Sequence, residues 1–268
     1  MKDISNKSNT LYLLDQYNIK ASRKYGQNFI IDPNIIKKII EYAHIDKTTT
    51  IIEIGPGLGA LSEYLAYNSR YVIAYEIDPK FKEVLNESLS EIDNIEIIYE
   101  DFLKVDLDAL IEQYDKVATV SNMPYYITSD LIEKIVKTNK MTSLTCMIQK
   151  EVAEKLIFLS TPLSMMLRYR GDIEYCFTLP KSVFLPEPHV ESAVIHVKFK
   201  NDYDQDLYNT LKICFKQKRK TIYNNLRDYI DRDSLINIEI DPSKRPEELK
   251  IEDYIRLSNY LKGANHES

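Results

Sequence analysis

The pentapeptide Asn122-Met123-Pro124-Tyr125-Tyr126 combines residue types that could do chemistry at the end of a strand. The asparagine side-chain oxygen and the Met123 carbonyl can each accept a hydrogen bond from an amine. Pro124 restricts Met123 to an extended conformation, which aims that carbonyl, and Tyr125 can stack on a flat ring. The motif alone therefore predicts N-methylation of an amine on a flat ring. It predicts no role for Tyr126.

A glycine-rich loop, EIGPGLGALS, follows the first apolar run and opens a helical pattern. Its glycines allow a tight turn and a close approach of the backbone to a ligand. Glu53 stands two residues before Gly55, and Gly57 follows. Dinucleotide-dependent enzymes use a similar turn, so the loop alone indicates only a nucleotide-type cofactor.

Acidic residues end the next two predicted strands. Glu76 comes about 20 residues after the glycines, where a carboxylate can accept both ribose hydroxyls. Asp101 and Phe102 end the third strand, where an acid can accept from an adenine amine and a ring can pack on its face. An NAD-type cofactor would need similar acids, but it leaves the motif at Asn122 without a role. These residues together indicate a cofactor that contains ribose and adenine.

Apolar β-branched runs alternate with helical patterns along the first 170 residues, which predicts a parallel sheet covered on both faces. The fold class is therefore α/β. Two further strands, 172–179 and Ser192–Phe199, are expected to close a sheet edge as a hairpin. The five strands expected before them are Thr49–Gly55, Arg70–Asp78, Ile95–Phe102, 116–121 and Ser143–Gln149.

A polar linker, Asn201–Asp206, separates this region from a second one that is helical throughout. We expect a domain over 1–200, with an N-terminal tail or helix over 1–20, and a small helical domain over 201–268. A helix predicted across 207–230 carries the run Lys212–Arg227, which has six basic residues and no acid. This run is the candidate for contact with RNA, and a solvated helix face is the alternative.

The composition excludes several classes of protein. With 44% hydrophobic and 28% charged residues, the 268-residue chain is typical of a soluble globular protein, and a net charge of −6 argues against bulk nucleic-acid binding. No apolar run is long enough for a membrane span, and no secretory signal is evident. Three scattered cysteines and four dispersed histidines predict neither disulfides nor a metal site. We expect a cytoplasmic monomer.

Several segments, in this order, resemble those of the small-subunit (16S) ribosomal RNA adenine dimethyltransferases. They are GQNFIID, EIGPGLGALS, YEID, EDFL, SNMPYYITS, QKEVAEKL, VFLPEPHVESAV, FKQKRKTIYNNL and IDPSKRPEEL. The resemblance covers about residues 11–261. It implies a Rossmann-like, seven-stranded S-adenosylmethionine-dependent methyltransferase domain with a small all-helical C-terminal domain. The substrate implied is a pair of adjacent adenosines in a hairpin near the 3′ end of the RNA, in an immature 30S particle.

The resemblance also implies roles for individual residues. Gln27 and Asn28 would form a lid over the methionine moiety, and Phe184 would lie on the opposite face of the flipped base from Tyr125. For Tyr125 and Phe184 the alternative is an ordinary core aromatic. The cofactor-binding set implied is Gln27, Asn28, Ile30, Glu53, Gly55, Gly57, Glu76, Ile77, Asp101, Phe102 and Asn122. The catalytic set is Asn122, Met123, Pro124, Tyr125 and Phe184, and the RNA-binding set is Lys218, Arg219 and Lys220.

Other functions remain open at this point. The erythromycin-resistance methyltransferases, which act on large-subunit (23S) RNA, share the glycine loop and the Asn-x-Pro-Tyr motif. A ribosome-assembly factor whose catalysis is secondary would use the same surfaces, and DNA or small-molecule N-methyltransferases also carry Asn-x-Pro-Tyr. The chain departs from the family after Leu156, where the loop is about eight residues shorter than is usual, and again after Ile230.

Overall fold

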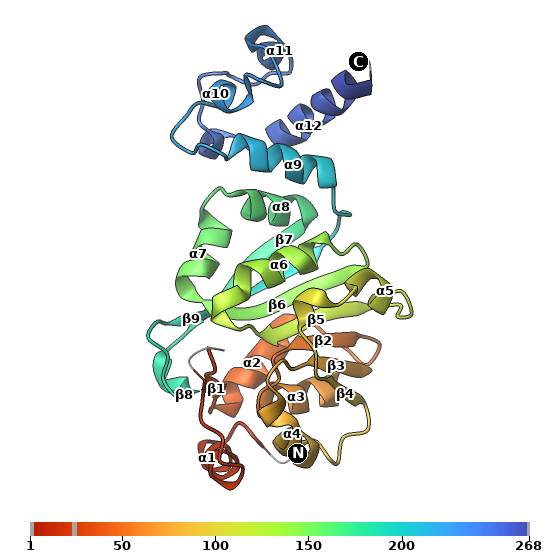
Figure 1. Cartoon of the computed structure of the whole chain (residues 1–268), viewed down its shortest axis with the longest axis vertical. Coiled ribbons are helices and arrows are strands. Elements are labelled where there is room, and N and C mark those ends of the chain that lie inside the picture. Colours follow the sequence, from red (N-terminus) through yellow and green to blue (C-terminus); the bar gives the residue numbers. More distant parts are fainter. Residues whose placement is uncertain (1–2, 23–25, 267–268) are drawn as a thin grey trace. The chain divides into compact units, whose positions relative to one another are not determined.

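The computed structural model describes residues 3–22 and 26–266 (Figure 1). The chain divides into two compact units. The first consists of Met1–Ala153 and Ile173–Phe199, and the second of Glu154–Asp172 and Lys200–Ser268. No helix in the described part of the chain is both long and apolar enough to cross a membrane.

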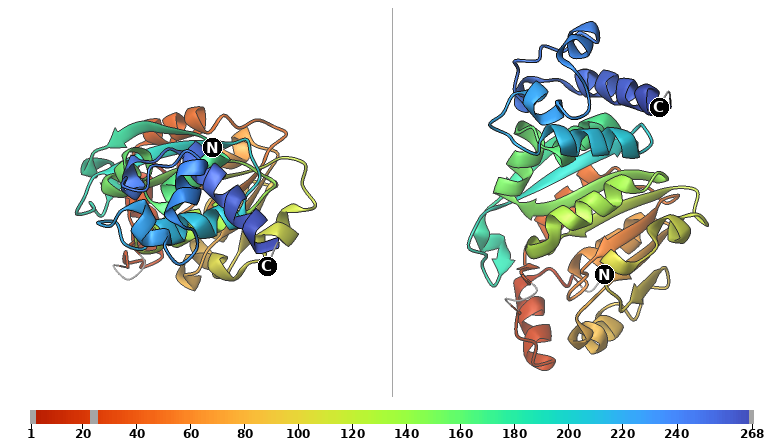
Figure 2. Two further views of the ribbon diagram at one scale, coloured as in Figure 1. Left: turned by 90° about the horizontal axis from the view of Figure 1, so that it is seen from above. Right: turned by 45° about the horizontal axis from the view of Figure 1, so that its top comes forward.

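The first unit is built on a seven-stranded sheet with the strand order β4-β3-β2-β5-β6-β9-β7. All seven predicted strands are present. The pairs β2–β3, β3–β4, β2–β5 and β5–β6 are parallel and β6–β9 is antiparallel, as expected for a parallel sheet with a closing hairpin. Figure 2 shows these strands from two further sides. Their bounds are β2 Thr50–Ile54, β3 Tyr71–Tyr75, β4 Ile95–Ile98, β5 Val117–Asn122, β6 Met141–Gln149, β7 Gly171–Leu179 and β9 Ser192–Phe199.

Helices cover both faces of this sheet. On one face α2 (Pro33–Ala43) packs against α3 (Ala60–Asn68), and α6 (Thr128–Lys137) lies on the other (Figure 1). Helix α2 begins at Pro33, because Asp32 accepts a hydrogen bond from the Asn34 amide and Pro33 occupies the first turn. The remaining helices of this unit are α1 Lys7–Gln16, η1 Pro79–Phe81, α4 Lys82–Ser88, η2 Phe102–Lys104, α5 Leu107–Ile111, η3 Tyr125–Ile127 and η4 Lys181–Val183. Helix α7 (Lys150–Phe158) begins in the first unit and ends in the second.

A second, two-stranded sheet was not predicted. Strand β1 (Phe29–Ile30) pairs antiparallel with β8 (Phe184–Leu185), so that Ile30 lies opposite Phe184. Strands of two residues carry no readable periodicity, which is why the sequence pattern did not reveal them. This pairing brings the segment before α2 to the loop before β9.

The second unit is helical. Helix α9 (Gln205–Cys214) contacts α8 (Pro162–Arg170), α10 (Ile222–Leu226) and α12 (Ile251–His266). The unit also contains α11 (Arg232–Asn237) and the short helix η5 (Pro246–Glu248). Helix α8 therefore groups with helices that follow it by more than thirty residues.

The helix predicted across 207–230 is wrong in its middle. Helix α9 ends at Cys214, and an exposed turn follows before α10 begins. The Asn225 side chain accepts from the Gln217 amide (2.9 Å) and donates to the Gln217 carbonyl (3.2 Å). Thr221 caps α10 by accepting from the Asn224 amide. These side chains satisfy backbone groups that a continuous helix would otherwise use.

Candidate active site

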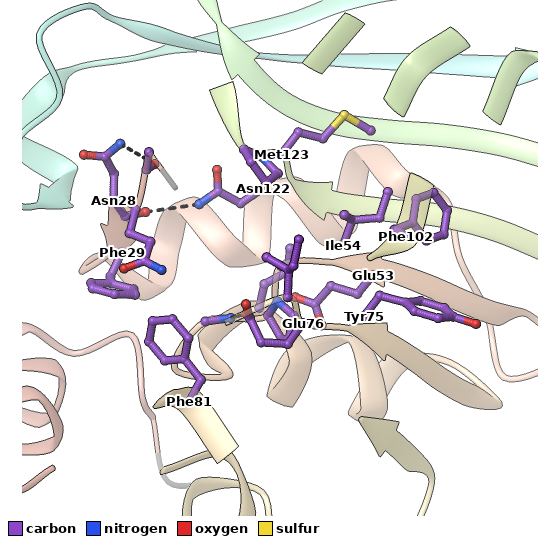
Figure 3. Close-up of a pocket in the computed structure, with 18 of the residues that line it drawn as sticks. Asn28, Phe29, Glu53, Ile54, Tyr75, Glu76, Phe81, Phe102, Asn122 and Met123 are labelled. Atoms are coloured by element: carbon purple, nitrogen blue, oxygen red, sulfur yellow. Dashed lines mark hydrogen bonds between the residues drawn. The ribbon is translucent and has the colours of Figure 1, made fainter. Parts of the chain in front are cut away.

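One pocket opens at the carboxyl edge of the parallel strands, where the loops after β2, β3, β4 and β5 converge with the segment Gly26–Ile30 (Figure 3). Ligands of open parallel sheets bind at this edge. Every residue of the predicted cofactor-binding set lines this pocket, namely Gln27, Asn28, Ile30, Glu53, Gly55, Gly57, Glu76, Ile77, Asp101, Phe102 and Asn122.

The glycine loop forms the floor of the pocket in a conformation that other residues rarely adopt. Gly55 and Gly57 have φ values of 72° and 58°. A Cβ atom on Gly57 would lie 3.2 Å from the Phe29 ring, and one on Gly55 would lie 3.7 Å from Pro124. The glycines are therefore needed both for the turn and for the close approach of two neighbouring segments.

Glu76 is buried at the end of β3, and the backbone holds its carboxylate. One oxygen accepts from the Gly57 amide at 3.2 Å, and the other accepts from the Asp78 amide at 2.9 Å. Burial raises the pKa of Glu76, and the amides of Asp78 and Gly57 oppose that shift. The carboxylate is thus fixed in the pocket wall, in the position expected for an acceptor of ribose hydroxyls.

Glu53 is the more unusual carboxyl group. Its side chain is 1% exposed, and Oε2 is buried without a hydrogen-bond partner. Burial raises the pKa of Glu53 to about 8, the nearby Ser62 hydroxyl lowers it in part, and the negative charge of Glu76 adds to the rise. A buried acceptor without a partner is costly unless a ligand supplies the missing donor.

The charge of the lining points to the kind of ligand. Glu53, Glu76, Glu100 and Asp101 line the pocket, while no Lys, Arg or His does so among the described residues. A ligand with a cationic centre would supply the missing positive charge. S-adenosylmethionine carries a sulfonium and an ammonium group, so the donor set fits this cofactor.

Asp101 and Phe102 line the pocket from the segment after β4. Asp101 accepts a hydrogen bond from the Leu103 amide at 3.0 Å. The Phe102 ring is buried and packs edge-on against Tyr75, with ring centroids 5.3 Å apart. Tyr75 is a lining residue that the sequence reasoning did not single out, although it precedes Glu76 directly.

Asn122 ends β5 beside the glycine loop, and its amide has a defined orientation. Its Nδ2 atom donates to the Asn28 carbonyl at 3.2 Å (Figure 3). Because a carbonyl only accepts, the nitrogen end must face Asn28, and Oδ1 is the end left for another ligand. Ser121 donates to the Ile54 carbonyl at 2.7 Å, which holds β5 against the start of the glycine loop.

Met123 and Pro124 also line the pocket. The Met123 amide donates to the Met147 carbonyl at 3.0 Å, so the chain stays attached to β6 one residue beyond the end of β5. Pro124 lies against the glycine loop, and its carbonyl accepts from the Thr128 hydroxyl at 3.0 Å. The predicted methylation motif therefore begins with three residues held by neighbouring strands and a helix.

Tyr125, Tyr126 and Phe184 differ from one another in their position relative to the pocket. The half-buried Tyr125 shares a hydrogen bond with the Ser192 hydroxyl at 2.5 Å and does not line the pocket. Tyr126, for which no role was predicted, does line it and is 49% exposed. Phe184 does not line the pocket: its ring is 1% exposed in a hydrophobic cluster with Ile30 and Leu179. In this structure the Phe184 ring therefore lies in the core, beside the β1–β8 pairing, and its contact with a flipped base stays a prediction.

Two buried aromatic residues that line the pocket were missed. Phe29 and Phe81 pack edge-on with ring centroids 5.9 Å apart, and both line the pocket (Figure 3). Each follows a polar or charged residue and lies in an element of two or three residues, which is too short to show a periodic pattern. The close approach of the Phe29 ring to Gly57 is what identifies Phe29 as a pocket residue, and this contact is visible only in the structure.

The predicted RNA-binding residues lie in the second unit. Lys218, Arg219 and Lys220 are exposed in the turn between α9 and α10. None of them forms an ion pair with any residue in 3–22 or 26–266. Their charges are therefore available to a polyanion.

The sheet order, the glycine loop and the carboxylates at consecutive strand ends define a Rossmann-like methyltransferase that uses S-adenosylmethionine. A family model described as "Ribosomal RNA adenine dimethylase" matches residues 18–263, and the chain belongs to that family. The expected fold class, enzyme class and cofactor are confirmed.

The relatives agree with this assignment. The chain is 40% identical to a protein of Macrococcus caseolyticus named ribosomal RNA small subunit methyltransferase A, over 97% of this chain and 96% of the relative. It is 35% identical to the protein of the same name from Bacillus pumilus, over 98% and 99%. The alignment with the first spans 286 residues, more than the 268 of this chain, so the relative has segments that this chain lacks.

Two solved structures resemble the fold. One is the 23S rRNA methyltransferase ErmE, with a TM-score of 0.71 and 25% identity over 87% of this chain and 99% of that one. The other is a dimethyladenosine transferase from Plasmodium falciparum, with a TM-score of 0.74 and 23% identity over 87% and 97%.

Proposed function

We propose that this protein transfers methyl groups from S-adenosylmethionine to N6 of two adjacent adenosines in a 3′-terminal hairpin of small-subunit (16S) ribosomal RNA. The products are N6,N6-dimethyladenosines, formed during biogenesis of the small subunit. The observation that carries the proposal is the orientation of Asn122, whose Oδ1 is left for a ligand beside the donor pocket. The names of the relatives supply the class of RNA.

The residues would act mainly by alignment. The N6 lone pair of adenine is delocalised into the ring, so the amine is a weak nucleophile, while the donor supplies a methyl group already activated on a sulfonium. Asn122 Oδ1 would accept one N6 hydrogen and the Met123 carbonyl the other. With both hydrogens held, the amine can pyramidalise and present its lone pair, and no strong base is needed.

The donor would be held by the residues at the strand ends. Gly55, Gly57 and Glu53 would hold the methionine part, with the Glu53 carboxyl opposite a positive charge. Glu76 would accept from the ribose hydroxyls, and Asp101 and Phe102 would hold the adenine. The burial of both glutamates excludes water, which strengthens these interactions.

The target adenosine must leave its base stack to reach a buried donor. Tyr125 would stack on the flipped base, with its hydroxyl anchored to Ser192. Stacking of this kind is worth roughly 1–3 kcal/mol per base. The turn that carries Lys218, Arg219 and Lys220 would contact the RNA backbone, and Asn225 would hold that turn in shape.

The test is to map the modified nucleotides. Purified protein is incubated with S-adenosylmethionine and either immature small-subunit particles or large-subunit RNA, and dimethyladenosines are located by mass spectrometry of RNA fragments. We expect two adjacent dimethyladenosines in the small-subunit RNA alone. Modification confined to the large-subunit RNA would overturn the proposal and favour the activity named for ErmE.

A second function is an assembly role that does not need catalysis. Its test is a strain that lacks this protein and receives the Asn122→Ala variant instead. If that variant restores small-subunit maturation fully, binding rather than methylation is the main contribution. We expect partial restoration at most.

A further inference from the structure

The loop that carries Glu76 also carries an ion pair that holds the N-terminal segment of the first unit. Lys80 Nζ lies 3.0 Å from Asp78 Oδ2 and 2.9 Å from Gln27 Oε1. Gln27 Nε2 donates to the same Asp78 oxygen at 3.0 Å. Lys80 also donates to the Lys20 carbonyl at 3.0 Å. Both ends of the Gln27 side chain are therefore bound by one ion pair.

The residue after Gln27 continues this chain of contacts to the methylation motif. Asn28 Nδ2 donates to the Gly26 carbonyl at 3.0 Å and closes a tight turn, in which Gly26 has a φ of 59°. The Asn28 carbonyl then accepts from Asn122 Nδ2 at 3.2 Å. A contiguous path of hydrogen bonds and two peptide units thus joins Lys80 to Asn122.

The ion pair differs from an ordinary surface pair. The Asp78 side chain is 10% exposed and the Lys80 side chain 31%, and both have a third partner in Gln27. Pairs held in a network at low exposure keep a defined geometry better than isolated surface pairs do. The position of Gln27 is therefore set in part by two side chains that do not line the pocket, together with the Ser22 amide, which donates to Gln27 Oε1 at 2.8 Å.

We propose that Asp78 and Lys80 are positioning residues for methyl transfer. By holding Gln27 they fix the Asn28 carbonyl, and that carbonyl decides which end of the Asn122 amide faces the substrate amine. Without it the amide can rotate and present Nδ2, a donor, to the N6 hydrogens, which are also donors. The inference rests on the proposed role of Asn122 and adds two residues outside the pocket to it.

The first measurement separates chemistry from binding. Lys80→Met is compared with the wild type in single-turnover methylation of immature small-subunit particles and in calorimetric titration with S-adenosylmethionine. We expect the rate constant to fall roughly tenfold to a hundredfold, as for small misplacements of a catalytic group, while the donor Kd changes less than about twofold. Lys80→Arg keeps the cation and should retain most of the rate.

A matched control is available on the same unit. Lys116 forms an ion pair with Asp46 at 2.7 Å, and its side chain is 38% exposed. Neither residue lines the pocket. Lys116→Met should change neither the rate constant nor the donor Kd.

The second measurement follows the Asn122 amide itself in the free protein. Its side-chain NH2 signal in a ¹⁵N spectrum is assigned by its loss in Asn122→Ala. We expect Lys80→Met to move this signal and Lys116→Met to leave it in place. An unmoved signal in Lys80→Met, or an unchanged rate constant, overturns the proposal, and so does a weakened donor Kd with normal chemistry. If Asn122→Ala itself methylates normally, the proposed function of the motif fails instead.

Discussion

The carboxyl group of Glu53 lies near enough to that of Glu76 for the charge on Glu76 to raise its pKa. Burial is the larger cause, and together they bring the pKa of Glu53 to about 8. The flanking strand β5 (Val117–Asn122) carries no titratable side chain that could offset this charge. Burial and the charge of Glu76 therefore favour the protonated form of Glu53 in the free protein, and a cationic ligand beside it would favour its ionised form.

The raised pKa of Glu53 should make the free energy of unfolding of the free protein depend on pH. The ordinary pKa of Glu53 is 4.5, so between pH 4.5 and 8 the folded chain holds a proton that the unfolded chain releases. The stabilisation is fully present below pH 4.5 and is lost as the pH rises through 8. We expect the free energy of unfolding in urea to fall between about pH 4.5 and about pH 8, and Glu53→Gln to flatten this fall. Glu100→Gln, which changes an exposed carboxylate of the same pocket, should leave the fall intact. An equally steep fall in Glu53→Gln would contradict the assignment.

Asn122→Ala should keep the donor and lose the chemistry. The substitution removes one acceptor aimed at the substrate, and losing a single preorganised group of this kind costs about 10²–10³ in rate. The donor Kd, measured by calorimetry, should stay within about threefold. Asn68→Ala is the matched control, because Asn68 also donates its amide to a backbone carbonyl, at 2.7 Å, but on α3. Near-normal methylation by Asn122→Ala would remove the basis of the mechanism.

Gly57→Ala should impair donor binding. The residue has a φ of 58°, and the added methyl group would lie 3.2 Å from the Phe29 ring, so the floor of the pocket must shift. We expect the donor Kd to rise at least about tenfold, since left-handed strain alone costs about 1 kcal/mol or more. Gly263→Ala, in α12, meets no atom within 4 Å and should leave the donor Kd unchanged. Equal Kd values for the two variants would show that the floor tolerates the methyl group.

The two tyrosines of the motif can be told apart by truncation. Tyr125→Ala should lower the rate about tenfold to a hundredfold, the value of one lost stacking contact. Tyr125→Phe keeps the ring and loses only the hydrogen bond to Ser192, so its loss should be a few-fold at most. The converse result, a large loss in Tyr126→Ala and a small one in Tyr125→Ala, would assign the stacking role to Tyr126, which lines the pocket.

The basic turn should set the salt dependence of RNA binding. Lys218→Met and Arg219→Met should each weaken binding similarly for all RNA sequences and reduce the salt slope by about one. Asn225→Ala, which leaves every charge in place, should also weaken binding, because the Gln217 backbone loses both of its hydrogen bonds to that side chain. Affinity is measured by filter binding at several salt concentrations. Unchanged slopes in the charge variants would exclude the turn as a contact surface.

The parts of the fold that follow from hydrophobic periodicity could be predicted from the sequence. The apolar strands place Glu53, Glu76 and Asp101 at one sheet edge, because parallel strands end on the same side. The convergence of these acids on one pocket is a consequence of that geometry. The helix across residues 207–230 could not be predicted correctly, since the hydrogen bonds of Asn225 outweigh the helical pattern there.

Contacts between segments distant in the sequence explain the other misses. Phe184 is expected at the flipped base because of the family resemblance, yet its strand pairs with β1 and its ring is buried. Lys80 and Gln27 are more than fifty residues apart and have no shared pattern, so their hydrogen bond is visible only in three dimensions.

The pairing of β1 with β8 also sets an order of events during synthesis. Phe29 and Ile30 line the donor pocket, and their strand partner, Phe184–Leu185, is made more than 150 residues later. The glycine loop and the acids at the ends of β2, β3 and β4 therefore leave the ribosome long before β1 can pair with β8. A nascent chain that ends before Phe184 has the floor of the pocket without its closing strand, so firm retention of the donor is a property that the protein acquires only when its first unit is almost complete.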